Sequence, residues 1–106
     1  MHPKTYTLSD IKTANRVRGL YFFSRDTLRF FRSRISARVH QGPGGIYFVT
    51  SEQFDERSPR LYTVRCFNPA SAGIDTVGEF QEHPTAYQAH AEAARLAAQV
   101  STPASC

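Results

Sequence analysis

The sequence is poor in cysteine and has no long apolar run, and both shortages narrow the class of protein. Its 106 residues include two cysteines, Cys66 and Cys106, too few for the disulfide framework of a small secreted domain. No stretch approaches the roughly 18 apolar residues of a membrane span, and residues 1–6 lack the features of a secretory signal. We therefore expect a cytoplasmic protein without a membrane partner, in which Cys66 is a small buried side chain.

Motifs of metal binding and catalysis are missing as well. The four histidines are His2, His40, His83 and His90. None belongs to an HExxH pair, and neither cysteine has a CxxC partner. The Gly-rich stretch 42–45 runs into a strand-like segment without a following Lys and Ser or Thr, which indicates a turn rather than a phosphate-binding loop. The sequence thus predicts no metal, no cofactor and no enzymatic activity, unless folding gathers a histidine with Cys66 or an acid.

The composition fits one domain with its own core. Hydrophobic residues make up 41% and charged residues 21% of the chain, which is typical of a globular protein. A chain of this length buries roughly two-thirds of its unfolded surface and needs no metal or disulfide to be stable. We expect a single domain over 1–106, with loose ends at about 1–5 and 101–106.

Residues that favour helices occur in the N-terminal and C-terminal parts of the sequence. Thr7 or Ser9 can cap a helix over 8 to 17, and Gly19 can end it. Ser24 reads as the cap of a second helix, over 24 to 34, in which apolar residues recur at helical spacing. Thr85 and Gln88 form a capping box for an alanine-rich helix that reaches Val100 and packs closely on a sheet.

The middle of the chain reads as strands. Residues 35–41 and 46–51 flank Gly42-Pro43-Gly44-Gly45, which predicts a hairpin. Residues 61–67 and 74–80 form a second pair, joined to the first by a loop over 54 to 60. The predicted fold is α+β, a four-stranded antiparallel meander with two short N-terminal helices and one C-terminal helix, in the order α-α-β-β-β-β-α.

Positive charge gathers in the first part of the chain. Residues 1–40 contain nine Lys and Arg against two Asp, whereas the remainder contains four Arg against seven acids. Acidic residues of the strand-like segments, such as Glu52, are expected on a solvated face. Arg25, Arg29 and Arg32 fall within about 60° on a helix, which predicts an arginine stripe beside the apolar one.

The arginine stripe is the candidate site. Its members are Arg25, Arg29 and Arg32, with Lys12, Arg16 and Arg18 as further cations and Phe30 as an exposed aromatic. Guanidinium groups bind carboxylates and phosphates with two hydrogen bonds, so we expect a protein partner, with a nucleic acid as the alternative. Two other interpretations stay open: a solvated charged face, and core positions for the aromatics. The oligomeric state is monomer or homodimer, the latter through an open edge strand.

Several segments resemble one family. They are Tyr6 to Lys12, Gly42 to Phe54, Tyr62 to Arg65 and Thr76 to Phe80, and together they are similar to small uncharacterised proteins of phages, prophages and plasmids. The resemblance covers about residues 5 to 98. It implies a stand-alone, non-enzymatic protein that binds a host component, namely a host protein or ribonucleoprotein complex. Anti-CRISPR proteins are the best-known example of that strategy. The implied function is inhibition of a host defence complex, with a nucleic-acid-binding regulator as the alternative.

Overall fold

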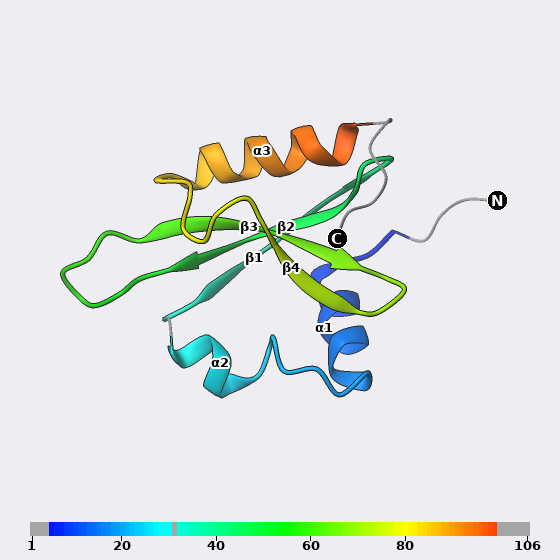
Figure 1. The fold of residues 1–106 in the computed structure, drawn as a ribbon, viewed down its shortest axis with the longest axis horizontal. Coiled ribbons are helices and arrows are strands. Elements are labelled where there is room, and N and C mark those ends of the chain that lie inside the picture. The colour runs from blue at the N-terminus through cyan, green and yellow to red at the C-terminus, as the bar shows by residue number, and fades with distance from the viewer. Residues whose placement is uncertain (1–4, 31, 100–106) are drawn as a thin grey trace.

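The computed structural model describes residues 5–30 and 32–99, and its centre is a twisted four-stranded sheet (Figure 1). The strands are β1 (Arg34–Gly42), β2 (Gly45–Glu52), β3 (Leu61–Asn68) and β4 (Gly73–Val77). Each strand pairs antiparallel with the next, in the order β1-β2-β3-β4. The predicted α+β class with an antiparallel meander is confirmed.

Helical segments cover both faces of this sheet. Figure 1 shows α3 (Ala86–Ala98) along one face and α1 (Leu8–Val17) with the short α2 (Arg25–Phe30) on the other. The β2 strand is therefore buried along nearly its whole length. Among the described residues, no helix is both long and apolar enough to cross a membrane.

The ends of α1 are set by local signals. Thr7 accepts from the Asp10 amide and Asp10 accepts from the Thr7 amide, which completes a capping box. At the other end Gly19 has φ +75°, and the Leu20 amide donates to the Asn15 carbonyl while the Gly19 amide donates to that of Arg16. These are the two bonds of a Schellman motif. The predicted bounds of this helix, and Gly19 as its stop, are confirmed.

The predicted second N-terminal helix over 24 to 34 is wrong. Only Arg25–Phe30 is helical, which is less than two turns. Arg32 then takes a left-handed φ of 49°, and the Ser33 amide donates to the Leu28 carbonyl. From Arg34 onward the chain pairs with β2 instead. The described residues thus contain two helices of regular length, not three, because pairing with the sheet takes up the end of the expected helix.

The first hairpin is confirmed and is tied to α3. The Gly44 amide donates to the Ala97 carbonyl at the end of α3, 2.9 Å away. A Cβ on Gly44 would lie 2.0 Å from the Leu96 carbonyl oxygen, and one on Gly42 would lie 2.4 Å from that of Ala97. Glycine is needed here because helix and turn backbones touch.

The second hairpin is shorter than predicted, since β4 ends at Val77 rather than at Phe80. Gly78 follows with φ +74°, a conformation that carries the chain away from the sheet. At the C-terminal side, Thr85 caps α3 by accepting from the Gln88 amide. The helix ends at Ala98, and the expected loose ends of the chain fall almost wholly outside the described residues.

Two apolar cores lie on the two sides of the sheet. The first joins three buried alanines of α3 to β2 and β3; its buried members are Tyr47, Val49, Val64, Cys66, Ala89, Ala93 and Ala97. The second lies under the N-terminal segments; its buried members are Ile11, Ile46, Phe48, Phe67 and Ala72. Close packing of the alanine-rich helix on the sheet and burial of Cys66 are both confirmed.

Candidate functional site

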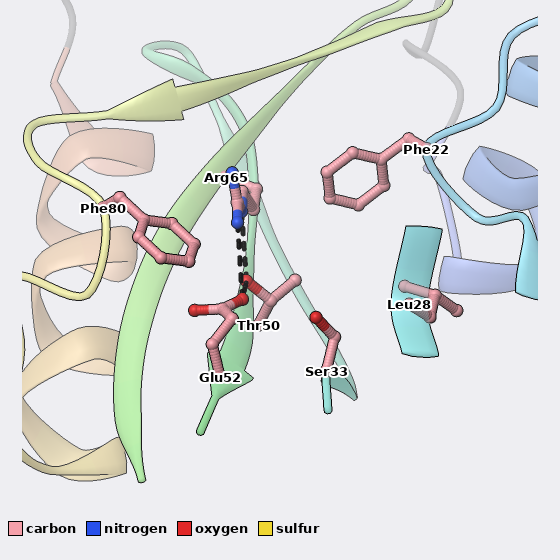
Figure 2. Close-up of a pocket in the computed structure, with 7 residues that line it drawn as sticks. All are labelled: Phe22, Leu28, Ser33, Thr50, Glu52, Arg65 and Phe80. Carbon is pink, nitrogen blue, oxygen red and sulfur yellow. Dashed lines mark hydrogen bonds and ion pairs between the residues drawn. The ribbon is translucent and has the colours of Figure 1, made fainter. Parts of the chain in front are cut away.

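A polar cluster interrupts the N-terminal face of the sheet, and it stands at the floor of a cavity (Figure 2). Thr50 and Glu52 come from β2, and Thr63 and Arg65 come from β3. Side chains alternate across a strand, so these four share one face while Val49 and Val64 point to α3. The antiparallel register places Thr50 opposite Thr63.

Glu52 is the centre of this cluster. It is 1% exposed, although a solvated position was expected, and that expectation is wrong. Its carboxylate accepts from Thr50 Oγ1 at 2.5 Å and from Thr63 Oγ1 at 2.8 Å, and Arg65 Nη2 lies 3.3 Å away. Both carboxylate oxygens are therefore occupied, as a buried charge requires.

Arg65 is held between two aromatic rings. Its guanidinium carbon lies 5.3 Å from the ring centre of Phe22 and 5.5 Å from that of Phe80, and Figure 2 shows the guanidinium between them. Nε donates to Thr50 Oγ1 at 3.0 Å. Burial lowers the pKa of Arg65 and the Glu52 carboxylate opposes this shift, but the guanidinium stays charged at neutral pH. The Glu52–Arg65 pair thus forms the floor of the cavity, and the two rings hold the guanidinium in place.

The cavity itself is apolar above this floor. Its volume is about 340 Å³. Phe22, Leu28 and Phe80 form its walls, and Ser33, Thr50, Glu52 and Arg65 complete the lining. Because the carboxylate and the guanidinium already bind each other, the cavity offers an incoming group mainly apolar contact and the exposed parts of two rings. This chemistry suits an apolar or aromatic side chain.

The arginines predicted as the site lie beside this cavity, on the segment that carries Leu28. Arg25 and Arg29 are one helical turn apart on α2, and Arg32 follows in the turn. All three are exposed and form no ion pair within the described part of the chain. The predicted continuous stripe is broken, because Arg32 has left the helix. The side chain of Phe30 lies outside what the structure describes.

The other predicted cations belong to α1 and its end. Lys12 and Arg16 are exposed and line a second cavity, between α1 and the segment 19–24. Arg18 instead donates to the Ala70 carbonyl, 3.1 Å away, and so helps to hold the β3–β4 connection against α1. The structure thus divides the six predicted cations between the segment of α2 and the turn after it, and α1 with its C-terminal end.

Folding brings two histidines together. His40 Nε2 of β1 and His90 Nδ1 of α3 are 3.0 Å apart in a hydrogen bond, and His40 is buried. Burial lowers the pKa of both, and Arg38 adds to the lowering. His83 is elsewhere, with Nε2 3.1 Å from a Glu82 oxygen but without hydrogen-bond geometry. In the described segments no three His, Cys, Asp or Glu side chains gather as metal ligands.

Sequence reasoning missed the buried Glu52–Arg65 pair. A signal was present, since Phe48, Thr50 and Glu52 alternate along one strand and Thr63, Arg65 and Phe67 along another. Phe48 and Phe67 mark that face as buried. A charged side chain on such a buried face requires a partner, and the opposite charges on these two neighbouring strands supply it.

Comparison with known proteins identifies one family for the chain and no individual protein that is similar to it. No curated protein matches the sequence. No solved structure matches the fold. A family model described as "Family of unknown function (DUF7447)" matches residues 7–94, a span that includes α1, the whole sheet and most of α3. The chain therefore belongs to this family, DUF7447, whose function is unknown.

Proposed function

We propose that the chain is a non-enzymatic binding protein that docks on an acidic protein surface through Arg25, Arg29, Arg32 and the adjacent Phe22/Leu28/Phe80 cavity. The observation that carries the proposal is this juxtaposition: exposed arginines without ion pairs in the described residues, beside an apolar cavity of about 340 Å³. We name these residues together the arginine–phenylalanine surface.

Each part of this surface has a role in recognition. Binding hot spots combine a desolvated apolar anchor with surrounding polar groups, and arginine and aromatic residues are enriched in them. An apolar side chain of the partner would fill the cavity, while its carboxylates would pair with the three arginines in bidentate fashion. Arg60 adds a fourth cation close by, since its Nη1 donates to the Arg32 carbonyl at 3.0 Å.

The partner we propose is a host defence complex, and the mode of action is inhibition. The support for this step is the resemblance to small proteins of phages, prophages and plasmids, which implies a mobile genetic element and an anti-CRISPR-like role. Occlusion of a working surface needs shape and charge but no catalytic group, which fits a site whose one buried carboxylate is fully hydrogen bonded. We place the protein in the cytoplasm of the host cell.

The first test is biological. The chain is expressed in bacteria with active CRISPR immunity against a phage, and the efficiency of plaquing is measured. We expect plaquing to rise by orders of magnitude with the wild-type chain, and R25E/R29E/R32E to abolish the rise. Failure of the wild type against each CRISPR type tried would remove the defence assignment.

The matched control reverses three other arginines. R38E/R57E/R95E makes the same change of net charge at the β1 edge, in the 53–60 loop and on α3, at residues that do not line the Phe22/Leu28/Phe80 cavity. We expect it to keep the activity. Equal loss in both triple variants would point to net charge rather than to this surface. Thermal melts show whether each variant is folded.

The second test concerns the partner class. A pull-down from a bacterial lysate, with protein and nucleic acid assayed in the same sample, is compared between the wild type and Leu28→Glu, which places a carboxylate in the cavity wall. We expect a captured protein that the variant loses. Capture of nucleic acid alone, with an affinity that falls steeply with salt, would favour the alternative function, a nucleic-acid-binding regulator.

A further inference from the structure

A second cavity, separate from the arginine–phenylalanine surface, lies between α1 and the segment that follows it. Its volume is about 250 Å³, and Lys12, Asn15, Arg16, Tyr21 and Phe23 are among the residues that line it. Phe22, at the centre of that segment, lines the other cavity instead. An inference about this second site therefore does not depend on the proposed function.

Asn15 leaves an acceptor without a donor in this region. The residue is 1% exposed. Its Nδ2 donates to the Ala72 carbonyl, 2.9 Å away, whereas its Oδ1 is buried and accepts no hydrogen bond within the described residues. Asn15 must keep this orientation, because the flipped amide would set its oxygen against the Ala72 carbonyl. A buried acceptor without a donor is costly, so a ligand that reaches it should bring an N–H group.

Two cations stand one helical turn apart beside the same cavity. Lys12 and Arg16 are both exposed, on α1, and neither forms an ion pair with a described carboxylate. Four-residue spacing places them on one face of the helix. Together they suit an anionic group with several oxygens, for which guanidinium and ammonium groups are the common ligands in proteins.

Aromatic surface completes the lining. Tyr21 is 76% exposed and Phe23 is half-buried, with its ring stacked 6.0 Å from that of Phe48. Phe23 is thus fixed by the core, while the Tyr21 side chain is largely exposed. A flat apolar ligand can stack on such a surface.

We propose that this cavity binds a nucleotide whose base carries an amino group, as adenine and cytosine do. The amino group donates toward Asn15 Oδ1, the base stacks on Tyr21, and the phosphate lies between Lys12 and Arg16. One molecule then supplies the missing donor, the flat apolar body and the anion. Free mononucleotides and unpaired nucleotides of a single strand share this chemistry.

The test follows backbone amide signals by NMR while a series of ligands is added to the full chain. The series is AMP, purine riboside 5′-monophosphate, which lacks the amino group, inorganic phosphate, a short oligo-dA strand and a DNA duplex. We expect AMP or oligo-dA to shift signals of residues 12–24, and removal of the amino group to weaken binding about tenfold. Shifts with AMP identify a free nucleotide as sufficient, and shifts with oligo-dA alone assign the site to single strands.

Variants separate the contributions of the side chains. K12E/R16E should weaken binding by at least about tenfold, and Tyr21→Ala by about tenfold. R57E/R95E, which makes the same charge change at two exposed positions outside both cavities, should bind as the wild type does. Loss of nucleotide binding in K12E/R16E with inhibition intact would uphold this inference whatever becomes of the proposed function.

Three results would overturn the inference. One is an absence of shifts with any ligand. Another is equal affinity for phosphate and AMP, which would describe an anion site without base recognition. The last is binding of duplex as tight as that of single strand, which would indicate phosphate contacts along a backbone.

Discussion

The two faces of the sheet are built in different ways, although the same two central strands supply both. The α3 face is closed by small side chains: Ala89, Ala93 and Ala97 are buried against Tyr47, Val49, Val64 and Cys66. The N-terminal face is covered by α1, by a six-residue helix and by connecting segments. It contains both cavities described above and a buried ion pair.

This difference separates stability from recognition within one small chain. Alanines allow a helix to pack closely on the two central strands, and the hollows on the α3 side are lined in part by the edge strand β1. Large rings and short segments cannot fill their face so completely, so cavities remain, and polar groups beneath them must bind one another. We therefore expect substitutions on the α3 face to alter folding alone, and those around the cavities to alter binding as well.

The largest loss of stability is expected when the Glu52–Arg65 ion pair at the floor of the cavity is broken. Glu52→Ala leaves the Arg65 guanidinium buried without its carboxylate, and loss of one partner of a buried pair costs about 3 to 5 kcal/mol. Chemical denaturation measures the free energy of unfolding. Glu56→Ala, at an exposed position of the 53–60 loop, is the control and should be nearly neutral. A loss below about 1 kcal/mol for Glu52→Ala would show that water replaces the pair readily.

A slightly smaller loss of stability is expected from a substitution at the contact between the first hairpin turn and α3. Gly44→Ala places a Cβ 2.0 Å from the Leu96 carbonyl oxygen, and the helix must move to admit it, which costs about 3 kcal/mol. Gly73→Ala is the matched control, because its Cβ would meet only the flexible Ser71 hydroxyl, at 3.2 Å. Equal midpoints for the two variants in thermal melts would contradict the tight contact.

We expect pH to have a moderate effect on stability through two histidines, one on β1 and one on α3. The folded pKa values of His40 and His90 lie below the usual 6.5, so the unfolded chain takes up protons first as pH falls. Stability is then full above pH 6.5 and declines below it. Melting temperatures between pH 7.5 and 5 measure the decline, and His90→Gln should flatten it. An unchanged slope in that variant would assign the decline to other groups.

The smallest change in stability is expected when a second arginine–glutamate pair, at the surface of α3, is removed. Arg95 Nε and a Glu92 oxygen are 2.5 Å apart, but the Arg95 side chain is 58% exposed. Water and salt screen such a pair. Arg95→Ala should leave the denaturation midpoint unchanged within error, in contrast to Glu52→Ala. A clear loss of stability would show that this pair is coupled to the packing of the helix beneath it.

Features with local causes were predictable from the sequence. Thr7 and Gly19 mark the ends of α1, and Gly42 to Gly45 mark a hairpin, because a cap, a left-handed residue or a tight turn is specified by a few neighbouring residues. Close packing of the alanine-rich helix also follows from its composition. In each case the local preference and the final structure agree.

Features that depend on strand register were not predictable. The helix expected over 24 to 34 fails because Ile35, which continues its apolar spacing, instead pairs with Thr50 in the sheet. The ion pair joins residues 13 apart in the chain, and Asn15 reaches Ala72 across 57 positions. Such contacts arise only once the strands and α1 are in place, so the candidate cavities were outside the reach of sequence patterns.

The bond from Gly44 to Ala97 also bears on how the protein is made. The first hairpin leaves the ribosome well before α3, which carries the carbonyl that the turn binds and covers that side of the sheet. During translation the apolar side chains that α3 later covers are unshielded, a state that favours contact with chaperones. Completion of this domain is thus coupled to emergence of its last helix from the exit tunnel.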